Sequence, residues 1–143
     1  MFLGKFAHTI DDKGRITVPA KFRERLAQGL VVTTGIDACL WLFPLDVWET
    51  LADKIVALPL TDPRARDFRR RVFADASHAV PDKQGRVNLP SYLREYAHID
   101  NQAIIAGLYD HCEIWAPEIW REHQERSHSD PEGHAAQFAS LGI

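Results

Sequence analysis

The sequence is poor in the residues and segments that define several common classes of protein. Only two of its 143 residues are cysteine, Cys39 and Cys112, and no CxxC pair occurs, which argues against a disulfide framework and a structural zinc site. No apolar run approaches the roughly 18 residues that span a membrane, and charged residues follow the N-terminus too soon for a secretory signal. We therefore expect a folded, soluble intracellular protein.

Motifs of catalysis are also missing. No glycine-rich phosphate loop of the Walker or Rossmann type is present. The chain has seven histidines, but His123, His128 and His134 are spaced by five and six residues, which suits no compact set of metal ligands on one helix. We expect no enzymatic activity, no metal or other cofactor, and no small-molecule ligand.

Positive charge is scarce overall but unevenly distributed. The formal net charge is −3, yet residues 1–72 carry 12 Lys/Arg against 9 Asp/Glu, whereas residues 73–143 carry 5 against 11. An acidic total does not exclude a nucleic-acid partner, because one basic face is enough to meet phosphates and oligomerisation would gather such faces. Net charge therefore leaves the class of partner open.

The most informative feature that is present is an internal duplication. Residues 11–23 return as residues 82–94, at an offset of 71, with Asp, Gly, Arg, Pro and Arg in register. The match continues downstream, so the two copies cover about 5–48 and 76–120, separated by a connector at 49–75 and followed by a polar tail at 121–143. Units of roughly 60 to 70 residues bury little surface alone, so we expect the copies to share a core or to oligomerise.

Each copy contains the same order of local signals. An Asp-x-x-Gly turn lies between two short alternating segments, a proline then begins a short helix, and two further strands follow. The sequence thus predicts an α+β fold of two tandem β-hairpin–helix–β-hairpin units. In the connector, a stripe from Trp48 to Leu58 and the cap Asp62-Pro63 predict two helices. The tail predicts only a short or frayed helical segment.

The paired motifs closely resemble those of the MraZ family, within the wider group of AbrB-like swapped-hairpin transcription factors. The resemblance runs essentially end to end, and it rests on Gly4, on Asp11-x-x-Gly14-Arg15 with Pro19, Phe22 and Arg23, and on Asp82-x-Gln84-Gly85-Arg86 with Pro90, Leu93 and Arg94. It implies that the two units interlock about a pseudo-twofold axis as a swapped-hairpin barrel with connecting helices.

The resemblance also implies a function. Members of the family assemble into rings and bind short direct repeats upstream of the division and cell-wall gene cluster, which includes their own promoter. We accordingly expect a cytoplasmic, nucleoid-associated regulator of transcription, with double-stranded DNA and further copies of itself as partners. The alternative is a protein-interaction or antitoxin-like scaffold for which DNA binding is secondary.

The candidate DNA-binding residues surround the two turns. Arg15 and Arg86 follow the turn glycines Gly14 and Gly85, and an arginine fork fits either a guanine edge or a phosphate. Equally, each arginine could pair with its turn aspartate, Asp11 or Asp82, and hold the hairpin instead. The basic residues expected to neutralise phosphates are Lys5, Lys13, Lys21 and Arg23 in the first copy, and Lys83 and Arg94 in the second.

Three further expectations concern the rest of the chain. The second copy has fewer basic neighbours, since Gln84 stands where the first has Lys13, so we expect the first copy to dominate DNA binding. The arginine row at 64–71 contacts either DNA or, in the favoured interpretation, solvent or acids of a neighbouring subunit. The four tryptophans are expected in the core or a subunit interface rather than stacked on single-stranded bases: Trp41, Trp48, Trp115 and Trp120.

Overall fold

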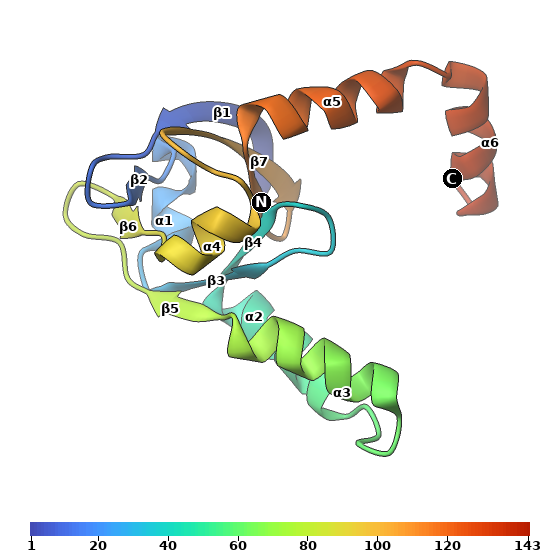
Figure 1. Ribbon diagram of the computed structural model, residues 1–143, viewed down its shortest axis with the longest axis horizontal. Coiled ribbons are helices and arrows are strands. Elements are labelled where there is room, and N and C mark those ends of the chain that lie inside the picture. Colours follow the sequence, from blue (N-terminus) through green and yellow to red (C-terminus); the bar gives the residue numbers. More distant parts are fainter.

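A computed structural model describes residues 1–143 and shows a β-structure with helices around it (Figure 1). The eight strands are β1 (Phe2–Thr9), β2 (Arg15–Thr17), β3 (Leu30–Thr34), β4 (Leu40–Pro44), β5 (Ser77–Ala79), β6 (Arg86–Asn88), β7 (Gln102–Tyr109) and β8 (Cys112–Trp115). The helices are η1 (Ala20–Phe22), α1 (Arg23–Leu26), α2 (Leu45–Val56), α3 (Pro63–Arg69), the π-helical η2 (Arg70–Ala74), α4 (Ser91–Tyr96), α5 (Pro117–His128) and α6 (Pro131–Ser140). The predicted α+β class is confirmed.

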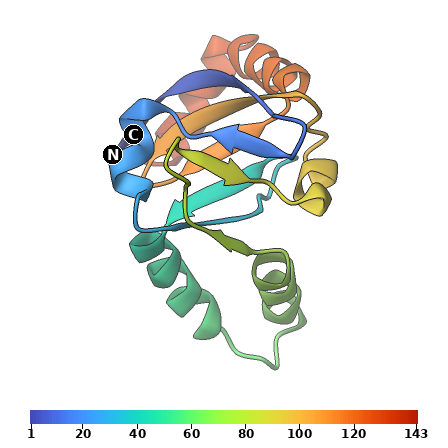
Figure 2. The same cartoon turned by 90° about the vertical axis from the view of Figure 1, so that its left-hand side faces the viewer.

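The strands form two antiparallel sheets whose order exchanges elements between the repeats. The larger sheet has the order β1-β7-β8-β4-β3-β5, and the smaller is the pair β2-β6, whose blue and yellow-green strands lie side by side in Figure 2. The first strand of each repeat lies beside the third strand of the other, because β1 pairs with β7 and β5 pairs with β3. The pair β4-β8 lies between these halves, so the strand order is symmetric about its centre.

This exchange corrects the expectation that each unit begins with its own hairpin. The turn after β1 forms as predicted, but β1 and β2 share only an isolated bridge between Ile10 and Ile16. Instead, β2 pairs with β6 of the other repeat, and Ile16 lies opposite Val87. Strands of three residues bury too little surface alone, whereas the pairing across repeats buries both of these side chains almost completely.

The two repeats share one hydrophobic core, as their small size led us to expect. It contains matched residues from both copies, including Ile16 with Val87, Val18 with Leu89, and Phe22 with Leu93. Full burial of such an aliphatic or aromatic side chain contributes about 1.5–3 kcal/mol. Contact between the two halves of the sequence therefore contributes to the stability of both.

The connector forms the two helices that its sequence predicts. Asp62 caps α3, its side chain accepting a hydrogen bond of 2.9 Å from the backbone N–H of Arg64, and Pro63 occupies the first helical turn. The helix continues into η2, where the carbonyl of Val72 accepts a 2.7 Å hydrogen bond from the buried hydroxyl of Thr33. This contact attaches the end of the helical pair α2–α3 to the larger sheet.

The C-terminal segment is more helical than the sequence suggests. Two helices, α5 and α6, replace the expected short or frayed segment, and Asp130 caps α6 through the N–H of Gly133. The start of α5 is attached to the sheet by Trp120, whose ring packs edge-on against Trp115. Beyond it the helices project away from the body of the protein (Figure 1). None of the helices is both long and apolar enough to cross a membrane.

Candidate nucleic-acid interface

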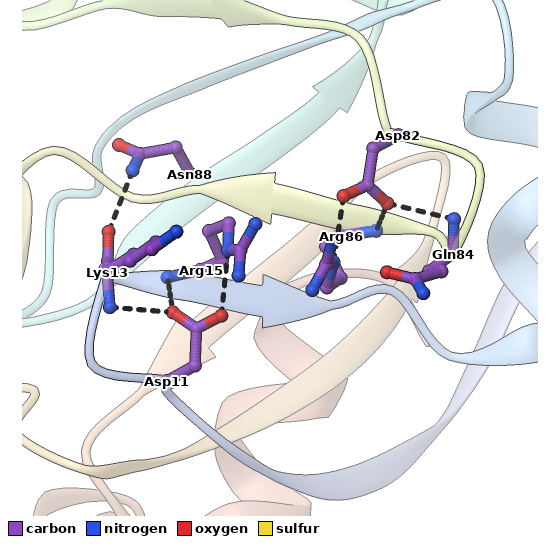
Figure 3. Close-up of polar contacts among 7 residues, drawn as sticks. All are labelled: Asp11, Lys13, Arg15, Asp82, Gln84, Arg86 and Asn88. Carbon is purple, nitrogen blue, oxygen red and sulfur yellow. Dashed lines mark hydrogen bonds and ion pairs between the residues drawn. The ribbon is translucent and has the colours of Figure 1, made fainter.

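The pair β2-β6 forms a two-stranded ribbon with one buried and one outer face. Ile16 and Val87 point into the core, so the alternate residues point outward. In the register, Arg15 lies opposite Asn88, and Thr17 lies opposite Arg86. Both motif arginines therefore lie on the same outer face, as diagonal neighbours with Cα atoms about 7–8 Å apart. Figure 3 shows them side by side, with one turn aspartate at each end.

The first turn is held by Asp11. One carboxylate oxygen accepts hydrogen bonds from the backbone N–H of Lys13 at 3.0 Å and of Arg15 at 2.8 Å. The other accepts a 2.7 Å bond from Nε of Arg15. Gly14 has a φ of 78°, a left-handed conformation that favours glycine. One aspartate thus shapes the turn and also fixes the arginine that follows it.

The second turn repeats this geometry closely. Asp82 accepts from the N–H of Gln84 at 2.9 Å, from the N–H of Arg86 at 2.8 Å and from Nε of Arg86 at 2.8 Å. Gly85 has a φ of 75°. Figure 3 shows the two sets of bonds at opposite ends of the ribbon. The turn geometry is thus the same in both repeats, although residue 84 differs in charge from residue 13.

Both turn aspartates are charged. The hydrogen bond from the backbone N–H of Arg15, followed by the bond and charge of its side chain, lowers the pKa of Asp11 below its usual value of 3.8. The same contacts from Arg86 lower the pKa of Asp82. Each arginine is therefore held by an ionised partner, which gives a charge-assisted hydrogen bond.

The aspartates leave part of each guanidinium free. Only Nε of Arg15 and of Arg86 is bonded, while Nη1 and Nη2 of both form no hydrogen bond within the protein. The two side chains retain 28% and 32% of their exposure. The structural and the DNA-binding interpretations of these arginines are thus compatible. Each aspartate orients the guanidinium through Nε and leaves Nη1 and Nη2 available to donate to DNA.

Strand exchange brings an arginine from each repeat to the turn of the other. Nε of Arg94 donates to the carbonyl of Leu89 at 2.9 Å, and the guanidinium lies against Gly14. In the first repeat, Nε of Arg23 donates to the carbonyl of Val18 at 3.1 Å, and its guanidinium lies against Gly85. Each turn is therefore completed by an arginine of the other repeat.

Three of the remaining basic residues are exposed. Lys13 and Lys83 are exposed on the two turns, and Lys21 is exposed on η1. Lys5 is not brought to the ribbon. Its ammonium lies 6.0 Å from the ring centre of Trp120, on the face of the sheet that α5 covers, because Phe6 occupies the inward position beside it.

One contact of the region was not anticipated. The side-chain amide of Asn88 donates a 3.1 Å bond to the carbonyl of Lys13, which joins β6 to the first turn. The matching position in the first repeat is Thr17, so this bond has no counterpart at the second turn. The difference between Asn88 and Thr17, at a matched position of the two repeats, is the one sequence signal that could have indicated this bond.

The arginine row at 64–71 is not one uniform surface. Arg71 donates to the carbonyl of Gly35 at 2.8 Å and to the hydroxyl of Tyr96, and its guanidinium lies over that ring at 5.6 Å. It therefore links the connector to the second repeat. Arg64 and Arg70 instead pair with Asp62 and Asp67 on their own helix and stay largely exposed.

The tryptophans pack against aromatic neighbours. Trp115 is buried, and Trp120 packs against it. Trp41 packs edge-on against Phe43, and Trp48 is tilted against the same ring. These contacts agree with the expected structural role of the four indoles.

Comparison with known proteins places the chain in a family. The model of the family described as "MraZ protein, putative antitoxin-like" matches twice, over residues 1–71 and 72–141. The chain belongs to the MraZ family. The two matches also confirm the internal duplication, since they divide the chain at the offset between the two turns.

Curated members of the MraZ family are similar to the chain over nearly its whole length. A protein of Thermomicrobium roseum named transcriptional regulator MraZ is 47% identical over 141 residues, covering 99% of both chains. Proteins with the same name from Herpetosiphon aurantiacus and Desulfitobacterium hafniense are 48% and 43% identical over 143 residues, covering 100% of both. These three relatives are thus named as regulators of transcription and not as enzymes.

Proposed function

We propose that the protein is a sequence-specific, DNA-binding regulator of transcription that reads the duplex with its β2-β6 ribbon. The observation that carries this proposal is the pair of aspartate-held arginines, Arg15 and Arg86, side by side on the outer face with free terminal nitrogens. The major groove, about 12 Å wide, admits a two-stranded ribbon, and a bidentate arginine–guanine contact contributes about 1–3 kcal/mol of discrimination.

The surrounding basic residues supply contacts to phosphates. Six basic residues lie at or against the two turns, opposed by Asp11, Asp12 and Asp82: Lys13, Arg15, Arg23, Lys83, Arg86 and Arg94. Lys21 adds a further positive charge nearby on η1. Contacts of this kind set the position of the protein on the duplex and make affinity fall with salt, without carrying sequence information.

The exchanged strands support the AbrB-like swapped-hairpin barrel as the fold of this regulator, with both halves supplied by one chain. We divide it into the repeats 5–48 and 76–120, the connector 49–75 and the C-terminal segment 121–143. The protein acts as a ring-like homo-oligomer, whose subunits meet successive direct repeats upstream of the division and cell-wall gene cluster and its own gene. Its site of action is the cytoplasmic nucleoid.

A second candidate is a protein-interaction or antitoxin-like scaffold with secondary DNA binding. The wording of the family description and the exposed helices α5 and α6, which bury no residue, favour it. This candidate predicts tight binding to another protein together with weak DNA binding that lacks sequence preference.

Binding of the purified protein to its own upstream region and to scrambled DNA tests the proposal. Fluorescence anisotropy at two salt concentrations should show preference for the natural sequence, and affinity should weaken with salt. Arg15→Ala and Arg86→Ala should each reduce the preference, while the control Arg121→Ala, an exposed arginine of α5, should retain it. Equal binding to scrambled DNA would overturn the proposal and favour the scaffold.

A further inference from the structure

The outer face of the β2-β6 ribbon presents four side chains, of which only two are motif arginines. Arg15 and Thr17 point outward from β2, and Arg86 and Asn88 point outward from β6, because the residue between them on each strand points into the core. The register places Asn88 opposite Arg15 and Thr17 opposite Arg86. Asn88 is exposed, and Thr17 is partly exposed. Each arginine therefore has one polar neighbour across the ribbon.

These polar neighbours break the symmetry of the ribbon. The offset of 71 that relates the repeats matches Arg15 with Arg86, and Thr17 with Asn88. The arginines keep nearly the same bond to their aspartates, at 2.7 and 2.8 Å. A threonine hydroxyl offers a single donor, whereas an asparagine amide offers two N–H donors and a carbonyl oxygen. The two halves of the ribbon thus carry equal arginines with unequal chemistry beside them.

Asn88 is held in place by the first turn. Its Nδ2 donates a 3.1 Å hydrogen bond to the backbone carbonyl of Lys13, and Figure 3 shows the two residues at the same end of the ribbon as Arg15. This bond uses one of the two N–H donors, so the other donor and Oδ1 have no hydrogen-bond partner within the protein. The amide is therefore oriented by one contact and keeps a donor and an acceptor for a ligand, as the guanidinium of Arg15 keeps its terminal nitrogens.

A donor and an acceptor on one amide match the edge of adenine. In the major groove, asparagine accepts from N6 of adenine and donates to N7, whereas threonine bonds to several bases without such a preference. Side chains directly opposite each other on a ribbon have Cβ atoms about 4.5–5.5 Å apart, and stacked bases are about 3.4 Å apart. Arg15 and Asn88 are therefore spaced to reach neighbouring base pairs.

We propose that Asn88 is a specificity-determining residue that selects adenine in the base pair next to the guanine contacted by Arg15. This inference deepens the proposed function and rests on it. Thr17 makes no such selection beside Arg86, so the ribbon reads a sequence that lacks twofold symmetry. The protein therefore distinguishes the two orientations of its site, although its two motif arginines are related by the symmetry of the repeats.

Binding of the full-length protein to single-site duplexes, with each base pair replaced in turn, tests this assignment by competition in fluorescence anisotropy. The wild type should prefer adenine over the other bases by about 5- to 150-fold at one position beside a guanine. Asn88→Thr, which introduces the residue of the matched position, should lose this preference and keep the guanine preferences. Its melting temperature should match the wild type, because residue 88 is exposed and threonine suits a strand.

Exchange of the two residues supplies a rescue. Thr17→Asn with Asn88→Thr places the amide opposite Arg86, at the other end of the ribbon. The adenine preference should return, but with the protein turned around on the duplex. A DNA-cleaving reagent attached at Asp12→Cys, an exposed position of the first turn, reports this reversal, since the two native cysteines are buried. The cut should move from one side of the site to the other.

The outcomes separate this inference from the proposed function. An adenine preference that survives Asn88→Thr, or an exchange that does not restore it, would overturn the inference, while the guanine preferences would still support the proposed function. Uniformly weaker binding of Asn88→Thr to every duplex would give the residue a purely structural role, and would also overturn the inference. Wild-type binding without preference at any base pair would remove the proposed function and this inference with it.

Discussion

The guanidinium of Arg94 lies against Gly14, although the two residues belong to different repeats. A Cβ atom at Gly14 would come within 3.0 Å of Nη2 of Arg94, and one at Gly85 would come within 2.6 Å of Nε of Arg23. Each turn is therefore shaped to receive an arginine of the other repeat. Because of this reciprocal packing, residues of both repeats together form each of the two turns of the ribbon.

Alanine at either turn glycine should destabilise the protein. Both glycines have positive φ, where a Cβ atom costs about 1–2 kcal/mol, and the displaced arginine adds to this cost. We expect Gly85→Ala to lower the free energy of unfolding more than Gly14→Ala, because the added Cβ atom would lie closer to the arginine side chain. Urea unfolding measures both. The control Gly142→Ala has positive φ but nothing within 4 Å, and should change stability least. A Gly85→Ala protein as stable as the wild type would contradict the packing described.

Asn in place of Asp11 should weaken DNA binding while the turn still forms. An amide retains one oxygen for the backbone N–H groups of Lys13 and Arg15, but its NH₂ cannot accept from Nε of Arg15. We expect a loss of about tenfold or more in specific affinity, since a hydrogen bond to a charged group contributes about 1.5–3 kcal/mol. Asp12→Asn makes the same change of charge next to it, and should bind DNA at least as tightly as the wild type. Equal affinity of the two variants would contradict the orienting role.

Stability should decline in acid partly through the turn aspartates. Their folded-state pKa values lie below 3.8, so their contribution is fully present above that pH and is lost as the pH falls through the lowered values. In Asp11→Asn/Asp82→Asn this part of the pH dependence should be missing. Urea unfolding across the acid range measures it, with wild type and variant side by side. If the free energy of unfolding falls with pH in the same way in wild type and variant, the charge of these two carboxylates contributes nothing to stability.

The first turn should contribute more to DNA affinity than the second. The hydrogen bonds of the two turns agree closely, but only the first has a lysine directly before its glycine, Lys13 where the second turn has Gln84, and the bond from Asn88 to the carbonyl of that lysine. Arg15→Ala should therefore reduce specific affinity more than Arg86→Ala, in anisotropy titrations with the same duplex. Equal losses of specific affinity would refute this prediction and indicate that the two turns contribute equally to DNA binding.

Local features of the fold could be predicted from the sequence because their causes are local. The Asp-x-x-Gly turns and the cap at Asp62 depend on residues within four positions of each other. Strand partners do not: nothing near Ile16 indicates that Val87, rather than the preceding strand, lies opposite it. The helicity of the C-terminal segment was underestimated because no residue of α5 or α6 is buried, so the periodic pattern of a packed helix is weak.

In the candidate site, too, local contacts could be predicted from the sequence and contacts between the repeats could not. The pairing of Arg15 with Asp11 is implied by the motif itself, whereas the position of Arg94 beside Gly14 depends on the exchange of strands. The position of Lys5 could not be predicted, because a single positive residue in a weakly alternating segment does not reveal which face it occupies. In the structure its alternation with Phe6 directs it toward α5.

Base-analogue substitution combined with Arg15→Ala would test the central claim most directly. Each guanine of the bound repeat is replaced in turn by 7-deazaguanine, which lacks the N7 acceptor, and binding by wild type and variant is compared. The account predicts one guanine whose replacement costs the wild type about 1–3 kcal/mol of binding free energy and costs Arg15→Ala almost nothing, since the contact is already absent. The same penalty in both proteins at every guanine would show that Arg15 reads no base, and would contradict the account.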